Sequence, residues 1–398
     1  MIGFTKLLCG QATVSEVLRQ KNQQQEKTIS HLSPHLLQFS SEAAPVVAWN
    51  ITNRCNLLCR HCYREAGDCG TDGELSTAEA EALIRDLAEM KVPVLLLSGG
   101  EPLMREDFFY LVEFARDHGL RPVLSTNGTL ITLDVAIRLK QAGIQYVGVS
   151  IDGDEAIHDR FRGREGAFAA ALAGIRNAQA AGNKTGIRFT VNRLNWHTLP
   201  YVLDLVERES IARFCLYHLV YAGRGRDMAA IDTTPAQKRD IINMLIDRTL
   251  DFNRRGVEVE ILTTDNHADG IAILQYFENN APERVPEIRA LLKMHGGCSA
   301  GQKMANIDPS GNVHACQFWG HKSLGNVRDK RLSEIWSDSS DLFLCQLRNK
   351  EAHLEGKCGQ CRYKSLCGGC RVRAEAMTGN LWAEDPACYL EDWKESRA

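Results

Sequence analysis

Three closely spaced cysteines constrain this chain more than any other feature. In Cys55-Asn-Leu-Leu-Cys59-Arg-His-Cys62 they are separated by three and then two residues, and Tyr63 follows. The apolar run before them, residues 46–51, predicts a buried strand. Three thiolates on one loop can hold three irons of a four-iron cluster, which leaves one iron open to a small molecule. A zinc site would take a fourth ligand nearby, and a disulfide framework would not need this spacing.

A second group of cysteines lies toward the C-terminus. Eight of the 14 cysteines fall at Cys298 or later, and four of them form Cys358-x2-Cys361-x5-Cys367-x2-Cys370. A zinc ribbon separates its two pairs by roughly 15–20 residues, so this shorter separation argues against a ribbon. No signal peptide is expected at the N-terminus, which favours metal ligation over disulfides. We expect the remaining cysteines to be plain thiols: Cys9, Cys69, Cys215 and Cys345.

Apolar strands and amphipathic helices alternate through residues 46–230, which predicts six β/α units. Strands covered by helices form a parallel sheet, and the chemistry of such a sheet collects at the carboxyl ends of its strands. Polar and glycine-rich motifs follow the predicted strands at these ends. They are Gly99-Gly100-Glu101, Thr126-Asn127, Ser150 and Asp152.

The sequence divides into four regions. Residues 1–45 form an N-terminal extension, 46–230 the β/α region, 231–297 a bridging region and 298–398 the cysteine-rich region. In the bridging region we expect helices at 235–253 and 271–292 and a strand at 257–262. Asp265, His267 and Asp269 lie between the strand at 257–262 and the helix at 271–292. They can ligate metal or act as acid and base, although a polar turn with a helix cap is the simpler interpretation. A hairpin is expected around Pro309-Ser310-Gly311.

Composition excludes some partners. The net charge of −3 gives no attraction to nucleic acid or to a membrane surface. No apolar run approaches the roughly 20 residues that span a bilayer. We therefore expect a cytoplasmic protein with neither nucleic-acid nor membrane partners.

The Cys-x3-Cys-x2-Cys motif, followed by an aromatic residue, resembles the radical SAM superfamily. The resemblance implies an α/β fold, a partial (β/α)6 barrel over roughly residues 46–230. It also implies a [4Fe–4S] cluster on Cys55, Cys59 and Cys62 that binds S-adenosylmethionine and yields a 5′-deoxyadenosyl radical. In similar enzymes the Gly-Gly-Glu-Pro motif contacts the amino group of this cofactor, so Glu101 is expected to accept from it. The expected cofactor-binding residues are Gly99, Gly100, Glu101, Thr126, Asn127, Ser150 and Asp152.

The C-terminal cysteines resemble the SPASM extension of radical SAM enzymes, a small twitch-like iron–sulfur domain. By that resemblance one auxiliary [4Fe–4S] cluster has four protein ligands, which are Cys358, Cys361, Cys367 and Cys388. Three further cysteines remain for a second cluster: Cys298, Cys316 and Cys370. The sequence departs from the pattern in two ways. The last spacing is x2 instead of x3, and no fourth cysteine is evident for the second cluster, which is therefore either open at one iron or absent.

Segments outside this common core resemble the haem-biosynthesis branch of the superfamily, namely residues 1–8, 34–40, 45–50 and 216–225. The branch includes deacetylases of 12,18-didecarboxysiroheme and enzymes of haem d1 synthesis. It implies radical removal of two acetate side chains from an iron tetrapyrrole to give iron coproporphyrin III, with an electron donor such as ferredoxin or flavodoxin. No catalytic side chain is expected beyond the cluster itself.

A tetrapyrrole is a flat apolar disc edged with carboxylates, so it needs an apolar slot with arginines at its rim. The candidates lie on or after the last two strands of the β/α region: Arg188, Arg213, Arg224 and Arg226. Three alternatives remain. They are a haem d1 enzyme acting on a propionate, a peptide maturase, and a non-enzymatic electron carrier or zinc scaffold. The last is disfavoured because a carrier has no use for the glycine and ribose-type motifs.

Overall fold

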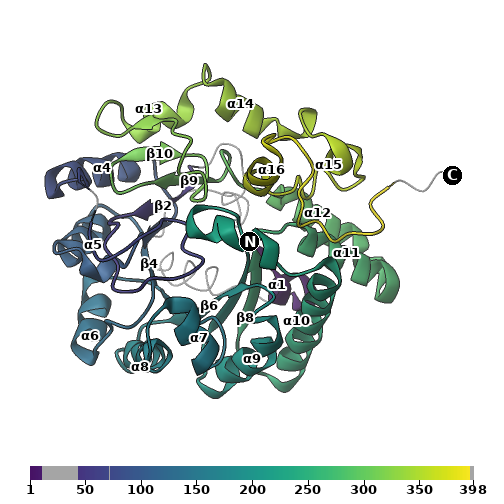
Figure 1. Cartoon of the computed structure of the whole chain (residues 1–398), viewed down its shortest axis with the longest axis horizontal. Coiled ribbons are helices and arrows are strands. Elements are labelled where there is room, and N and C mark those ends of the chain that lie inside the picture. Colours follow the sequence, from purple (N-terminus) through teal and green to yellow (C-terminus); the bar gives the residue numbers. More distant parts are fainter. Residues whose placement is uncertain (11–43, 71, 395–398) are drawn as a thin grey trace, which may run out of the picture.

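The computed structural model describes residues 1–10, 44–70 and 72–394. Its strands form one sheet in the order β1-β8-β7-β6-β5-β4-β3-β2-β9-β10-β11. Neighbours from β8 across to β9 are parallel, whereas β1 at one edge and the β9-β10-β11 turn at the other pair antiparallel. The α/β class predicted from the sequence is confirmed. Figure 1 shows the helices arranged around the outside of the curved sheet.

The six predicted β/α units are present. Their strands are β2 (Val46–Asn50), β3 (Leu95–Ser98), β4 (Pro122–Thr126), β5 (Val147–Ser150), β6 (Thr185–Val191) and β7 (Arg213–His218). The first five strands are followed by α4 (Thr77–Glu89), α5 (Phe108–Asp117), α6 (Leu133–Ala142), the pair α7 (Glu155–Arg162) and α8 (Ala167–Ala180), and α9 (Leu199–Arg208), and the helix after β7 is α10 (Pro235–Arg255). The short helix α7 was not expected, because its eight residues are mostly charged or polar. Asp154 nevertheless caps it by accepting from the N–H of Ile157.

The bridging region continues this sheet. After α10 (Pro235–Arg255), strand β8 (Glu260–Thr264) pairs in parallel with β7, so the parallel sheet extends beyond the six predicted strands. The single helix predicted at 271–292 is wrong. The chain forms α11 (Ala268–Asn280) and α12 (Val285–His295), separated by a 3-10 turn at Pro282–Arg284. Pro282 and Pro286 explain the break, because proline lacks the N–H that a continuous helix needs.

The start of the chain joins the far edge of the sheet. Strand β1 (Ile2–Gly3) pairs antiparallel with β8, and α1 (Phe4–Cys9) buries Phe4, Leu7 and Leu8 in the main apolar core. Residues 2–9 therefore belong to the same folded body as the barrel. The segment 34–40, which carried part of the haem-biosynthesis resemblance, lies outside the described residues.

The cysteine-rich region is attached to the opposite edge. Strand β9 (Met304–Ile307) pairs in parallel with β2 and forms an antiparallel hairpin with β10 (Asn312–His314), and β11 (Gly325–Asn326) extends the sheet beyond β10. The predicted hairpin is confirmed, with Gly311 at φ 85° in its turn. Four helices follow: α13 (Leu332–Ser337), α14 (Leu342–Arg348), α15 (Gly356–Gln360) and α16 (Arg371–Thr378). Figure 1 shows them following one another along one side of the molecule, from α13 beside α4 to α15 and α16. Within the described ranges, no helix combines the length and apolarity needed to cross a membrane.

Candidate active site and cluster sites

The three cysteines of the motif open into a cavity at the carboxyl ends of the parallel strands. The cavity holds about 950 Å³ of free space, part of it open to solvent. Most of the residues predicted to bind the cofactor line it together with the cysteines: Cys55, Cys59, Cys62, Gly99, Gly100, Thr126, Asn127 and Ser150. Motifs from four strand ends therefore meet here, as a parallel sheet requires.

Arg224 holds the cysteine loop from the far side of the barrel. Its guanidinium donates to the carbonyl oxygens of Cys59 at 2.8 Å and Ala66 at 3.0 Å, and its backbone N–H donates to that of Cys62. The neighbouring Gly223 has φ +52°, and a Cβ there would lie 2.6 Å from the carbonyl oxygens of both Cys62 and Tyr63. Gly223 and Arg224, which follow β7, thus hold the cysteine loop in place. Nothing in the sequence indicated this role.

The sulfur atoms lie in an environment that suits metal-bound thiolates. Burial raises the pKa of the Cys55 thiol to about 12 and also raises that of Cys59, while Arg162 opposes the effect at Cys59. The Nη1 atom of Arg162 lies 3.5 Å from Cys59 Sγ. A thiolate at these positions needs a nearby positive group, and an iron–sulfur cluster supplies it. The donor set, three thiols facing one cavity, fits a cluster with one open iron.

The glycine motif lies directly against the cysteine loop. A Cβ at Gly99 would be 2.4 Å from the carbonyl oxygen of Thr52, and one at Gly100 would be 2.2 Å from that of Arg54. Only glycine permits this approach. Both residues line the cavity through their backbone, so they can meet a cofactor there.

Glu101 does not take the position expected of it. Its side chain is fully buried beneath the strand ends, where it accepts from Thr126 Oγ1 at 2.8 Å, the N–H of Asn127 at 2.8 Å and that of Leu103 at 3.3 Å. Burial raises the pKa of Glu101 to about 7 against the effect of these donors. The carboxylate ties β3 to β4 and is absent from the cavity lining, so its expected contact with the cofactor stays a prediction.

Asp152 is likewise buried below the cavity. Its Oδ2 atom lies 2.5 Å from Arg162 Nη2 and 3.6 Å from His61 Nε2, and its Oδ1 accepts from the N–H of Thr190. Burial opposes ionisation, but Arg162 and His61 hold the pKa of Asp152 below its usual range. We interpret Asp152 as the anchor of Arg162. Arg162 itself was missed, because no sequence motif marks it.

The candidate arginines separate into distinct roles. Arg213 pairs with Glu260 at 2.6 Å and does not line the cavity, and Arg226 is exposed. Arg224 lines the cavity but holds the cysteine loop. Arg188 lines it with its guanidinium over the ring of Tyr217, 4.7 Å from the ring centroid, and contacts Ser125. Arg188 therefore remains the best candidate for binding a carboxylate.

Aromatic and aliphatic side chains complete the cavity wall. Tyr63 and Tyr217 come from the barrel, whereas Phe318 follows Cys316 in the C-terminal region. The rings of Tyr63 and Phe318 meet edge to face with centroids 5.2 Å apart. The C-terminal region thus forms part of the active-site wall. Phe318 gave no signal in the sequence.

The polar turn after β8 contributes two different groups. Asp265 lines the cavity, and its Oδ2 atom is buried without a hydrogen-bond partner. Asp269 instead accepts from Tyr389 at 2.8 Å and pairs with His218 Nε2 at 2.9 Å. The predicted capping turn is present in part, since Asn266 accepts from the N–H of Ala268. His267 is buried next to the ring of His295.

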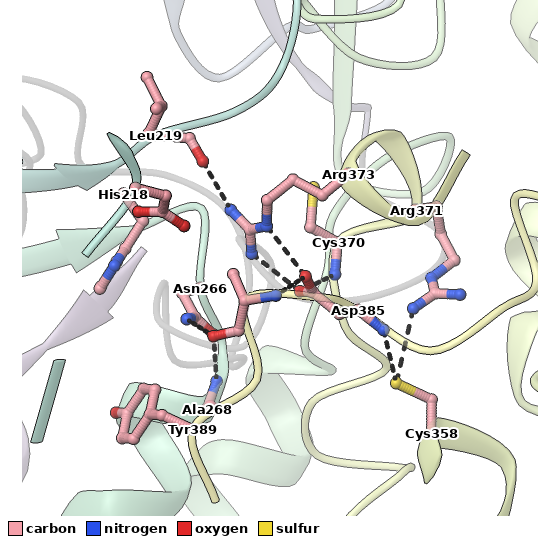
Figure 2. Close-up of polar contacts among 12 residues, drawn as sticks. His218, Leu219, Asn266, Ala268, Cys358, Cys370, Arg371, Arg373, Asp385 and Tyr389 are labelled. Carbon is pink, nitrogen blue, oxygen red and sulfur yellow. Dashed lines mark hydrogen bonds and ion pairs between the residues drawn. The ribbon is translucent and has the colours of Figure 1, made fainter. Parts of the chain in front are cut away.

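The four cysteines assigned to an auxiliary cluster surround one hollow of about 380 Å³: Cys358, Cys361, Cys367 and Cys388. Figure 2 shows Cys358 Sγ accepting from the N–H of Asp385 and from Arg371. The N–H of Tyr363 lies 3.4 Å from Cys361 Sγ. Four thiols around a hollow, with donors directed at their sulfurs, fit a fully ligated cluster.

The other three cysteines meet close by. Cys298 and Cys316 pack against a small apolar cluster that contains Cys370 and Trp319. The N–H of Cys298 donates to the carbonyl oxygen of Cys367, which joins the two sets. No fourth cysteine belongs to this set, and in the described part of the chain no three His, Cys, Asp or Glu side chains form a single-ion metal site. The three thiols remain candidates for a second auxiliary cluster.

Comparison with known proteins agrees with this geometry. The radical SAM superfamily model matches residues 49–206, and the SPASM iron–sulfur cluster-binding domain matches residues 298–362. The chain belongs to the radical SAM superfamily and is an enzyme that uses [4Fe–4S] clusters and S-adenosylmethionine.

Its relatives include enzymes of haem biosynthesis. The chain is 47% identical over 395 residues to the Fe-coproporphyrin III synthase of Methanosarcina barkeri, covering 98% of both chains. It is 43% identical to the pre-heme d1 synthase of Dinoroseobacter shibae, covering 87% of this chain and 86% of the other. Among solved structures, Streptococcus suis SuiB bound to S-adenosylmethionine matches with a TM-score of 0.69 at 18% identity, over 87% of this chain and 78% of SuiB. At that identity the match shows the shared fold alone.

Proposed function

We propose that this protein removes the two acetate side chains of 12,18-didecarboxysiroheme to give iron coproporphyrin III. The observation that carries the proposal is its similarity to Fe-coproporphyrin III synthase along the whole length of both chains. When bound, the cluster at Cys55, Cys59 and Cys62 supplies the electron that cleaves S-adenosylmethionine. The remaining work of the chain is to bind the substrate and exclude water.

The cavity suits such a substrate. Tyr63, Tyr217 and Phe318 offer the apolar and aromatic surface that a flat macrocycle needs, and Leu219 and Val220 continue it. Arg188 is placed to bind a carboxylate at the edge of the disc. A reduced electron donor such as ferredoxin or flavodoxin would supply the electrons. Cysteines that ligate clusters must stay reduced until the cluster is bound, so we place the enzyme in a reducing compartment, the cytoplasm.

The direct test uses anaerobically reconstituted protein with S-adenosylmethionine, a reductant and didecarboxysiroheme. Mass spectrometry should detect iron coproporphyrin III, with deoxyadenosine formed alongside. A tetrapyrrole that stays unchanged while a peptide is modified would overturn the proposal. Loss of a propionate would instead assign the enzyme to haem d1 synthesis, the second candidate, which the similarity to pre-heme d1 synthase favours.

Two arginine variants test the placement of the substrate. Arg188→Met should weaken tetrapyrrole binding at least tenfold, because removing a charge-assisted carboxylate contact costs about 1.5–3 kcal/mol. Arg226→Met removes an exposed arginine away from the cavity and should leave binding unchanged. Fluorescence or absorbance titration with the substrate measures both. Equal binding by the two variants would exclude Arg188 as the anchor.

A further inference from the structure

Arg371 is a buried cation without a carboxylate partner. It starts α16 and is 1% exposed. Its Nη1 atom donates to the carbonyl oxygens of Leu381 at 2.8 Å and Ala383 at 2.6 Å, and its Nη2 lies 3.7 Å from Cys358 Sγ. Among the residues that the structure describes, no carboxylate pairs with it. Because burying an uncompensated charge costs several kcal/mol, an anion is needed beside this guanidinium.

Arg373, two residues further along the same helix, shows the contrast. It is also fully buried, but it forms a two-point pair with Asp385, Nε to Oδ1 at 2.9 Å and Nη2 to Oδ2 at 2.8 Å (Figure 2). The two Asp385 oxygens also accept from the N–H groups of Cys370 and Ala387. The charge of Arg373 is therefore compensated by a carboxylate, and no hydrogen bond or ion pair joins that carboxylate to Arg371.

Arg371 contacts one of the four cysteines that surround the hollow. Cys358, the residue that it contacts, lines this hollow, and so do Lys357 and Lys364. A cluster bound by four thiolates is an anion, and its reduction adds one further negative charge. A fixed guanidinium at 3.7 Å from a ligand sulfur stabilises the more negative form most, and hydrogen bonds to the sulfur act in the same direction.

We propose that Arg371 is the counter-ion of the cluster held by Cys358, Cys361, Cys367 and Cys388 and that it raises the reduction potential of that cluster. Arg371 is a positioning residue, since it acts on the cluster through Cys358. The inference rests on the assignment of this cluster and is independent of the tetrapyrrole substrate. The guanidinium makes this cluster easier to reduce than the same four-thiolate cluster would be in neutral surroundings.

The test is a potentiometric titration of the reconstituted holoprotein, followed by electron paramagnetic resonance. The signal of this cluster is identified by its loss in Cys388→Ala. In Arg371→Met, the ratio of reduced to oxidised cluster at a fixed potential should fall at least tenfold, which is 59 mV for one electron. The other clusters should keep their midpoints. An unchanged midpoint at the identified cluster would overturn the proposal.

Arg348→Met is the matched control. Arg348 also donates to two backbone carbonyl oxygens in the C-terminal region, those of Gly301 and Trp336, and it contacts none of the four cysteines. Its replacement should leave every midpoint unchanged, and a shift as large as that of Arg371→Met would refute a specific role for Arg371.

Arg371→Lys covers the case of poor folding, because it keeps the charge. It should keep the ratio of reduced to oxidised cluster at a fixed potential within threefold of wild type. A purely structural role predicts that both Arg371 variants lose iron while the loaded fraction keeps its midpoint. Wild-type protein with the iron and sulfide of one cluster per chain would remove the basis of the proposal.

Discussion

The guanidinium of Arg162 joins the sulfur of Cys59 to the rest of the barrel. Its Nη1 atom lies 3.5 Å from Cys59 Sγ, while its Nη2 pairs with Asp152 at 2.5 Å. The arginine closes α7, the aspartate follows β5, and the cysteine belongs to the loop after β2. One buried ion pair therefore couples the geometry of the cluster loop to the strand end opposite it.

Breaking this pair should destabilise the protein. We expect Arg162→Gln to lower the free energy of unfolding by about 3–5 kcal/mol, because it leaves the carboxylate of Asp152 buried without its partner. Denaturant unfolding measures the change. The double variant Arg162→Gln with Asp152→Asn should recover part of the loss, since it contains no uncompensated charge. A loss below about 1 kcal/mol in the single variant would contradict the structural role of the pair.

Cys62→Ala should abolish deoxyadenosine formation with any substrate. A methyl group cannot ligate iron, and a site with three protein ligands has no spare ligand. Liquid chromatography of reactions with S-adenosylmethionine and dithionite measures the product. Cys345→Ala is the control, because Cys345 lies on α14, hydrogen-bonds the carbonyl oxygen of Ser339 and lines neither of the two cysteine-lined hollows. Undiminished product in Cys62→Ala would show that the site is wrongly placed.

Glu101 should make the protein less stable as the pH rises from 5 to 8. Burial raises its pKa from 4.5 to about 7 in the folded state, so between these values the folded chain binds more protons than the unfolded chain. The free energy of unfolding then falls as pH rises through this window, by about 3 kcal/mol in total. Glu101→Gln cannot titrate and should flatten that part of the profile, whereas the exposed Glu351→Gln should not. Urea unfolding at pH 5 and pH 8 measures the free energy of unfolding of each variant. Parallel profiles for wild type and Glu101→Gln would refute the raised pKa of Glu101.

Gly223→Ala should reduce cluster incorporation. Its φ is +52°, and the added Cβ would lie 2.6 Å from the carbonyl oxygens of Cys62 and Tyr63, so the cysteine loop must move. Gly182→Ala separates this effect from backbone strain. Gly182 has φ +76° with nothing near its Cβ position, and its replacement should cost about 1–2 kcal/mol without loss of iron. Iron analysis after reconstitution compares the two variants, and equal iron content would contradict the crowding argument.

The sequence by itself determined the class of fold and the location of the chemistry. Hydrophobic periodicity and the order of elements along the chain can be read from the sequence alone. The alternation of strands and helices therefore predicted a parallel sheet with its motifs at one edge. Cysteine spacing is also local, and it identified Cys55, Cys59 and Cys62 as one set, whereas the resemblance to the SPASM extension grouped Cys358, Cys361, Cys367 and Cys388. The structure brings each set around a hollow.

Only the tertiary structure decided which side chains face the cavity. Glu101 and Asp152 stand at strand ends as expected, but burial turns both into anchors that bind neighbouring strands and Arg162. Arg162, Phe318 and Arg371 carry no motif, because the Cys59 sulfur that Arg162 contacts lies 103 residues away and the partners of the other two lie on separate elements. Pairings between distant segments depend on how the sheet curves and on what the C-terminal region covers, and neither is encoded in local spacing. The physical reason is that a side chain's charge and contacts are set by the whole surrounding structure, whereas periodicity reports only its nearest neighbours along the chain.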